Sequence, residues 1–170
     1  MRQERRCVFE TNSSSTHSIC ITKNRNSELA YPTSLRFRCD EYGWGFERLN
    51  TPEDKASYLY SSFLSVYEKK DAEKAKSEIW QMLGSVGVEC EFDEAVYHNY
   101  DSGTYCVNAS VDHAGADDHA KFVNSVIRNK GRLLRYLFSE QSFVLIGNDN
   151  GCDEIDIVAD YPHEEYYKGN

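Results

Sequence analysis

The chain has 170 residues, of which 40% are hydrophobic and 13% aromatic. This length and composition suit one globular domain with a hydrophobic core and exclude a largely disordered chain. No apolar run approaches the roughly 20 residues that cross a bilayer. The charged start Met1–Arg6 lacks the apolar region of a signal peptide. We therefore expect a soluble cytoplasmic protein.

Acidic and basic side chains are unevenly distributed along the chain, whose formal net charge is −9. Residues 1–85 hold 13 basic and 12 acidic side chains, whereas residues 86–170 hold 6 basic and 16 acidic ones. Glu89–Asp118 and Glu140–Glu165 contain acids and no Lys or Arg, while Lys121–Arg135 between them contains bases and no acid. Such blocks produce local fields that select and steer charged partners.

The six cysteines stand singly, without a C-x-x-C pair: Cys7, Cys20, Cys39, Cys90, Cys106 and Cys152. In a reducing cytoplasm we expect reduced and mostly buried thiols, although an even number permits disulfides. The spacing of the histidines and cysteines matches no known set of zinc ligands. The residues concerned are His17, Cys20, His98, Cys106, His113 and His119. We therefore predict neither a metal nor another cofactor.

The first half of the chain predicts a hairpin, a strand and two helices. The hairpin spans residues 7–23, with β-prone runs on either side of a polar loop. Residues 35–39 alternate between apolar and basic side chains, which predicts a half-buried strand with a basic outer face. Thr51 and Pro52 form a strong helix start, and the apolar spacing that follows predicts an antiparallel helical hairpin over residues 52–87.

The second half predicts strands around one long helix. Strict alternation of apolar and acidic residues over 88–93 opens a group of strands that extends to residue 111. A helix is predicted over 117–138. The favoured turn pair Asn150-Gly151 places a C-terminal hairpin over 142–160, and the Tyr-rich tail 161–170 is expected to be peripheral.

These elements predict a single α+β domain over residues 1–170. Its sheet would be antiparallel or mixed, built from hairpins, with about three helices packed on one face. The regular alternation of strand and helix that produces a doubly wound parallel sheet is absent from the sequence.

The polar loop is the least ordinary part of the sequence. Its candidate residues are Thr11, Asn12, Ser13, Ser14, Ser15, Thr16 and His17. Such side chains can specify a turn by bonding to neighbouring backbone, or they can bind an anion together with backbone N–H groups. A third hypothesis makes Ser13 or Ser15 a nucleophile, with His17 as its base and Glu10 orienting the imidazole. No G-x-S-x-G elbow accompanies these residues.

The run Val-Phe-Glu-Thr-Asn-Ser-Ser-Ser-Thr-His-Ser at residues 8–18 resembles a family of small bacteriophage and mobile-element proteins that share this stretch. The resemblance covers about fifteen residues, and residues 142–151 are loosely similar too. It implies a phage or mobile-element accessory protein, a class that includes anti-CRISPR proteins and other inhibitors of host defence.

Acidic side chains recur on the outer faces of two predicted strands. Alternate strand residues lie about 6.7 Å apart, and each DNA strand carries a charge about every 3.4 Å. Such rows could therefore compete with DNA for a basic channel. The candidate partner-binding residues are Glu89, Glu91, Asp93, Glu94, Asp153, Glu154, Asp156 and Asp160. The alternatives are solvated surface, a divalent metal site, and paired carboxylates in a hydrolase.

The predicted helix over 117–138 carries a basic cluster made of Lys121, Arg128, Lys130, Arg132 and Arg135. Bases in the second half of a helix suit its dipole, which gives the cluster a structural explanation. Contact with nucleic acid is the functional one.

The hypothesis that combines these features is a non-enzymatic protein with no catalytic residue. It would bind and inhibit a host nucleic-acid-handling defence complex, such as a Cas nuclease with its guide RNA, through its acidic faces. One alternative is a phosphate- or nucleotide-binding protein or hydrolase that uses residues 11–18. Another is nucleic-acid binding through residues 121–135. No membrane partner is expected, and a homodimer is left open.

Overall fold

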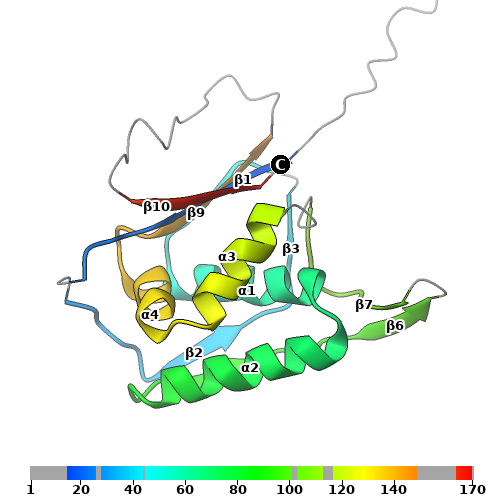
Figure 1. Cartoon of the computed structure of the whole chain (residues 1–170), viewed down its shortest axis with the longest axis horizontal. Coiled ribbons are helices and arrows are strands. Elements are labelled where there is room, and N and C mark those ends of the chain that lie inside the picture. Colours follow the sequence, from blue (N-terminus) through cyan, green and yellow to red (C-terminus); the bar gives the residue numbers. More distant parts are fainter. Residues whose placement is uncertain are drawn as a thin grey trace, which may run out of the picture.

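The largest sheet joins strands from both ends of the chain (Figure 1). The structure is a computed structural model that describes residues 15–25, 28–43, 45–100, 103–112, 117–148 and 164–169. The sheet has strand order β10-β1-β9-β4 and is antiparallel throughout. Its strands are β1 (Ser15–Ile21), β4 (Glu47–Leu49), β9 (Phe143–Asn148) and β10 (Glu165–Gly169).

Strand β1 is paired along both edges, with β9 on one side and β10 on the other. Its partners therefore come from the far end of the chain. Residues 7–10, which were predicted to pair with it, lie outside the described residues. Strand β9 matches the predicted first half of the C-terminal hairpin, whose second half, residues 152–160, also lies outside them.

The prediction of a peripheral tail is wrong, because β10 is an integral edge strand of this sheet. The ring of Tyr167 on β10 packs against the ring of Phe122, with ring centroids 5.7 Å apart. The Tyr167 hydroxyl also donates to Ser125 Oγ at 2.9 Å. The β-prone tyrosines were visible in the sequence, but their partner strand lies at the other end of the chain and no local pattern reveals it.

Three pairs of short strands complete the β structure. Strands β2 (Ser34–Phe37) and β5 (Glu89–Phe92) pair in parallel, as do β3 (Glu41–Tyr42) and β8 (Ser110–Val111). Strands β6 (Tyr97–Tyr100) and β7 (Gly103–Cys106) form an antiparallel ribbon. The strand expected over 104–111 is thus divided between β7 and β8, which have different partners.

The four helices of the described chain are α1 (Pro52–Val66), α2 (Lys69–Gly84), α3 (Asp117–Ile127) and α4 (Lys130–Phe138). Helices α1 and α2 match the predicted helical pair. Thr51 caps α1 as expected, since its side chain accepts the N–H of Asp54 at 3.2 Å. Together with the small sheets, the helices confirm the prediction of a single α+β domain.

The prediction of one helix over 117–138 is wrong, because the chain breaks between α3 and α4. Asn129 has an extended backbone, with φ −135° and ψ 100°, and its side chain accepts the N–H of Arg132 at 3.0 Å. Asparagine favours this N-cap role. The apolar spacing continues across the break and therefore conceals it.

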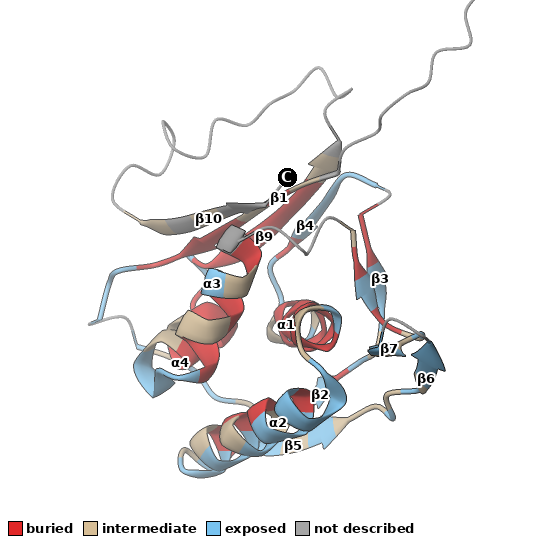
Figure 2. Ribbon diagram, turned by 45° about the vertical axis from the view of Figure 1, so that its right-hand side comes forward, coloured by how far each residue is buried: buried red, intermediate tan, exposed pale blue. Residues whose placement is uncertain are grey.

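Helix α1 lies at the centre of the molecule, and every residue from Lys55 to Leu64 is buried (Figure 2). Helices α2, α3 and α4 and strands β2 and β8 contact it. A helix that is buried on all sides must satisfy its polar side chains internally. Ser57 and Ser61 do so by accepting the backbone N–H groups of Arg38 and Asp40, at 3.2 and 3.1 Å.

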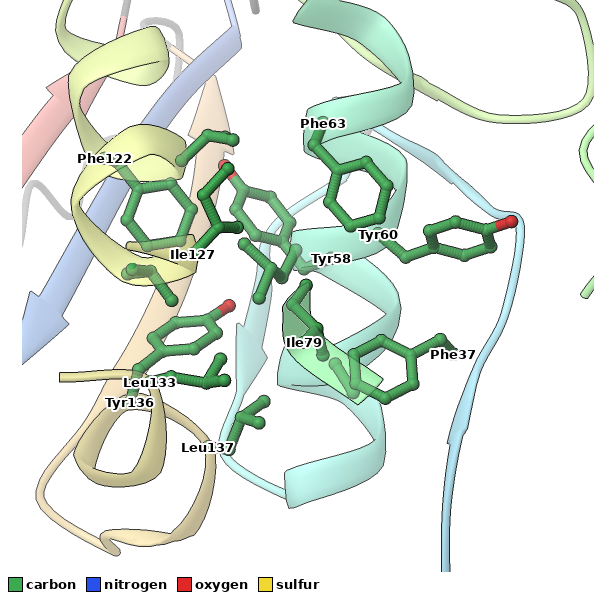
Figure 3. Close-up of a cluster of buried hydrophobic side chains, with 14 of the residues drawn as sticks. Phe37, Tyr58, Tyr60, Phe63, Ile79, Phe122, Ile127, Leu133, Tyr136 and Leu137 are labelled. Carbon is green, nitrogen blue, oxygen red and sulfur yellow. The ribbon is translucent and has the colours of Figure 1, made fainter. Parts of the chain in front are cut away.

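The core around α1 is rich in aromatic rings (Figure 3). Phe37, Tyr60 and Phe63 form edge-to-face contacts on one side of the helix. On the other side, Tyr58 and Phe122 lie with centroids 6.4 Å apart, and Phe122 meets Tyr136 at 5.3 Å. Edge-to-face packing adds to the stabilisation that comes from burying the rings.

Lys55 is a lysine buried in this core, at 1% exposure. Its Nζ donates to the carbonyl oxygens of Ser139 and Ser142, both at 2.9 Å. These carbonyls follow the end of α4, where the helix dipole favours a cation. Burial lowers the pKa of Lys55 to about 8. The ammonium group thus fastens α1 to the connection between α4 and β9.

Replacing Lys55 with methionine should reduce the free energy of unfolding by about 2 kcal/mol, because it removes two hydrogen bonds from a charged donor. Urea denaturation of Lys55→Met at neutral pH measures this change. Lys70→Met, an exposed helix lysine, is the matched control and should change stability little. Equal stability of the two variants would show that the buried ammonium contributes nothing net.

Candidate functional site

The polar loop of the sequence is only partly a loop. Thr11, Asn12, Ser13 and Ser14 lie outside the described residues, whereas Ser15, Thr16 and His17 belong to β1. Ser15 pairs with Asn148, and His17 with Ile146. Backbone pairing with β9 supplies the hydrogen bonds that these residues would otherwise make within a turn, so their polar side chains do not prevent a strand.

His17 points into the core, on the face of β1 that also carries the buried residues Ile19 and Ile21. The imidazole is completely buried, and its Nδ1 forms a hydrogen bond of 3.1 Å with the Tyr58 hydroxyl on α1. The hydroxyl of Tyr58 on the central helix thus gives the buried ring a polar partner.

His119 on α3 completes a buried cluster with His17 and Tyr58. Its ring lies 6.3 Å from the His17 ring and 5.9 Å from the Tyr58 ring, measured between centroids. His119 is 1% exposed, and its Nε2 has no hydrogen-bond partner among the described residues. Desolvation, followed by the nearby His17, lowers the pKa of His119 to about 4. The His119 imidazole is therefore uncharged at neutral pH.

This geometry does not support the hypothesis of a nucleophile with His17 as its base. A general base must come within hydrogen-bonding reach of the proton that it removes from the reacting group. The His17 ring has no exposed surface, and its Nδ1 is already bonded to Tyr58. Glu10, which was expected to orient the imidazole, lies outside the described residues. The described part of the motif joins β1 to α1 and is structural.

The acidic outer face of β5 is confirmed for two residues. Glu89 and Glu91 are exposed, while Cys90 and Phe92 turn inward. Glu94, just beyond the strand, is exposed too. The corresponding residues of the second acidic face, Asp153, Glu154, Asp156 and Asp160, lie outside the described residues.

Asp93 differs from its neighbours, because its charge is used within the fold. Arg36 on β2 donates from Nε and Nη2 to Asp93 Oδ1, at 3.0 and 2.8 Å. The backbone N–H of Cys39 donates to Oδ2 at 3.3 Å. The expectation that Asp93 extends a row of free carboxylates is therefore wrong. Arg36 is paired in register with Glu91, and its side chain reaches forward to the Asp93 carboxylate, so Asp93 is the residue whose charge is used.

The basic cluster is likewise divided. Arg132 forms an ion pair with Glu165 on β10, and Arg135 Nε donates to the carbonyl of Thr22 at 2.9 Å. These two side chains attach α4 to the sheet. Lys121, Arg128 and Lys130 are exposed. Two of the five bases are therefore used within the fold and are not available as part of an exposed basic face.

A surface that the sequence did not reveal lies on the β6–β7 ribbon, which projects from the helices (Figure 1). One face of the ribbon, here called the ribbon face, is formed by Val96, His98, Tyr100, Tyr105 and Val107. Tyr100 and Tyr105 are 56% and 50% exposed, with ring centroids 6.1 Å apart. Both faces of these strands carry apolar residues, so alternation alone does not show which face is exposed.

The ribbon face and the acids of β5 point away from the same helix. Lys69 Nζ on α2 lies 5.3 Å from the centroid of the inward-facing Tyr97 ring, and Lys76 Nζ lies 5.3 Å from that of Phe92. The inward-facing side chains of both segments therefore lie near α2, and the side chains that alternate with them point to the opposite side. We call Glu89, Glu91, Glu94 and the ribbon face together the interaction surface.

Of the residues considered for zinc, His113 lies outside the described residues. Among the described residues, no group of three or more His, Cys, Asp or Glu side chains could hold a metal ion. Cys20, Cys39, Cys90 and Cys106 are free thiols, and burial raises the pKa of the first three to about 11. The described helices include none with the length and apolar character required to cross a bilayer.

No family model, curated protein or solved structure matches this chain. Function must therefore be argued from the chain's own residues.

His119 should make stability depend on pH. Its folded-state pKa of about 4 lies below the ordinary 6.5, so the unfolded chain takes up a proton first as the pH falls. The stabilisation is complete above pH 6.5 and is lost progressively toward pH 4, to a total of about 3 kcal/mol. Urea denaturation across this range should show a smaller loss for His119→Phe than for the unaltered protein.

The exposed ribbon residue His98 provides the control for this experiment. His98→Gln removes a histidine without touching the buried cluster and should leave the pH dependence as it is. If His119→Phe and His98→Gln behave alike, the burial of His119 is not the cause of the pH dependence.

Proposed function

We propose that this protein is a non-enzymatic accessory protein of a phage or mobile element that inhibits a host nucleic-acid-handling defence complex. The candidate target is a Cas nuclease with its guide RNA. The observation that carries the proposal is the interaction surface, which combines the exposed tyrosines and valines of the ribbon face with three exposed carboxylates that come shortly before the ribbon in the chain.

The ribbon face has the composition of a protein-binding surface. Tyrosine is enriched among the residues that dominate binding energy at interfaces. Tyr100 and Tyr105 present adjoining rings, with Val96 and Val107 also more than 40% exposed. Within the described part of the chain, each ribbon strand is paired on one side only, and unpaired strand edges are sites where another chain can add. A partner that covers this face would remove considerable apolar surface from water.

The acidic residues that precede the ribbon in the chain indicate that the partner surface is basic. Glu89, Glu91 and Glu94 favour a basic surface through electrostatic complementarity. Arg36 neutralises Asp93, so these carboxylates do not reproduce a long regular phosphate row. We therefore assign the affinity mainly to the ribbon face and the steering mainly to the acids. The DNA-binding channel of a guide-directed nuclease offers basic surface of this kind, and the resemblance to phage proteins supports this context.

The first test is inhibition of guide-directed DNA cleavage by a purified Cas9-type nuclease, with this protein titrated into the reaction. Binding to naked DNA is measured alongside. We expect inhibition without affinity for free DNA, because the chain is acidic overall. If several such nucleases still cleave DNA at the normal rate when this protein is present at saturating concentration, the proposed target class is wrong.

Tyr100→Ser combined with Tyr105→Ser should weaken binding to the target complex about 30-fold, because losing about 1 kcal/mol at each of two interface tyrosines removes about 2 kcal/mol of binding free energy. The melting temperature should stay unchanged, since both side chains are exposed. Trp80→Ser on α2 is the matched control, because Trp80 is an exposed aromatic at 58% outside the interaction surface. Equal weakening by the control would contradict a role for the ribbon face.

Glu89→Gln combined with Glu91→Gln should mainly slow association and reduce its dependence on salt, as expected for charges at the rim of an interface. Surface plasmon resonance at two salt concentrations measures both effects. Glu28→Gln with Glu140→Gln changes the net charge equally at exposed positions elsewhere. Asp93 is left intact, because its replacement would disturb Arg36 and Cys39. An identical effect of the two double variants would assign the steering to net charge alone.

A further inference from the structure

Beside the break between α3 and α4 lies a pocket of about 450 Å³ that is widely open to solvent. Glu78, Gln81 and Met82 near the end of α2 form one side, and Ile127, Arg128 and Lys130 form the other. Asn129 directs the chain away from α3 at this point, so the two bases on either side of it stand at the rim. A volume of this size falls within the range of small-molecule sites, roughly 300–1,000 Å³.

The pocket is locally basic in an acidic protein. Arg128 and Lys130 are exposed, unlike Arg132 and Arg135, which attach α4 to the sheet. The one acid of the lining, Glu78, lies 3.9 Å from Lys74 on the same helix. Its charge is therefore partly offset, and the two rim bases remain to attract an anion. Arginine and lysine are the side chains that recognise phosphate.

The floor of the pocket is apolar. Ile127 is 5% exposed, and Met82 is half-buried and packs against the core. A methionine sulfur makes favourable contacts with aromatic rings, so this floor suits a flat heterocycle. Gln81 is exposed beside it and offers both a donor and an acceptor for the edge of such a ring.

From this combination we infer that the pocket binds a mononucleotide. The phosphate would lie between Arg128 and Lys130, and the base would lie on Met82 and Ile127. This assignment shares no residue with the interaction surface and does not depend on the proposed function.

Isothermal titration calorimetry of the full chain with adenosine monophosphate tests the inference. Adenosine and inorganic phosphate, titrated separately, measure the contributions of base and charge. We expect the nucleotide to bind at least tenfold more tightly than either part. Absence of nucleotide binding overturns the inference, and so does phosphate that binds as tightly as the nucleotide, because the floor would then contribute nothing.

Variants locate the binding. Arg128→Gln and Lys130→Gln should each weaken nucleotide binding about tenfold, the usual effect of losing a hydrogen bond to a charged group. Met82→Gln should weaken binding of the nucleotide and of adenosine alike. Lys70→Gln removes an exposed helix lysine away from the pocket and should leave the affinity unchanged. If Lys70→Gln acts as strongly as Lys130→Gln, general charge explains the binding and the pocket assignment fails.

A final experiment distinguishes a free nucleotide from the end of a nucleic-acid strand, because both present a phosphate and a base. A short single-stranded DNA with a 5′-phosphate should bind no more tightly than the mononucleotide, because Glu78 and the acidic remainder of the chain repel further phosphates. Clearly tighter binding of the strand would overturn the assignment to a free mononucleotide.

Discussion

The burial of α1 on every side is the constraint on which the rest of the structure depends. A central helix removes most of its polar groups from water, and such groups are costly unless they find partners within the protein. Lys55 holds the connection after α4, Ser57 and Ser61 hold the backbone after β2, and Tyr58 meets His17 on β1. The same helix therefore positions the sheet, the short parallel strands and the last helix, through polar contacts as well as apolar packing.

Local patterns in the sequence were sufficient to place α1 and α2, because apolar spacing and the Thr51 cap specify a helix wherever it lies. They could not show that α1 is central. Lys55, Ser57 and Ser61 resemble exposed residues in a sequence, since a polar side chain gives no sign of whether water or backbone is its partner. The break at Asn129 was concealed for a related reason, because the apolar spacing of α3 continues in phase into α4.

The candidate site was partly accessible to the same reasoning. Alternation correctly placed Glu89 and Glu91 on the outer face of β5. It failed at Asp93, whose partner Arg36 lies on a strand that pairs in parallel after a long connection. It gave no indication of the ribbon face, because Tyr97 and Tyr100 are equally apolar and only the position of α2 decides which is covered. The burial of His17 could not be predicted from its neighbours in the sequence, because its partner Tyr58 belongs to a distant element.

The position of β1 between β9 and β10 has a consequence for how the chain folds. Contacts such as that between Ser15 and Asn148 close a loop that contains nearly the whole described chain, and the entropy lost in closing it must be offset before the sheet can form. The contacts between α1 and α2 are far more local. Because folding rates fall as contacting residues become more distant in sequence, we expect the helical pair to assemble early and the sheet to close in the rate-limiting step. Mutations in β1 that destabilise its pairing would then slow folding, which stopped-flow refolding can measure, whereas comparable changes in α2 would mainly speed unfolding.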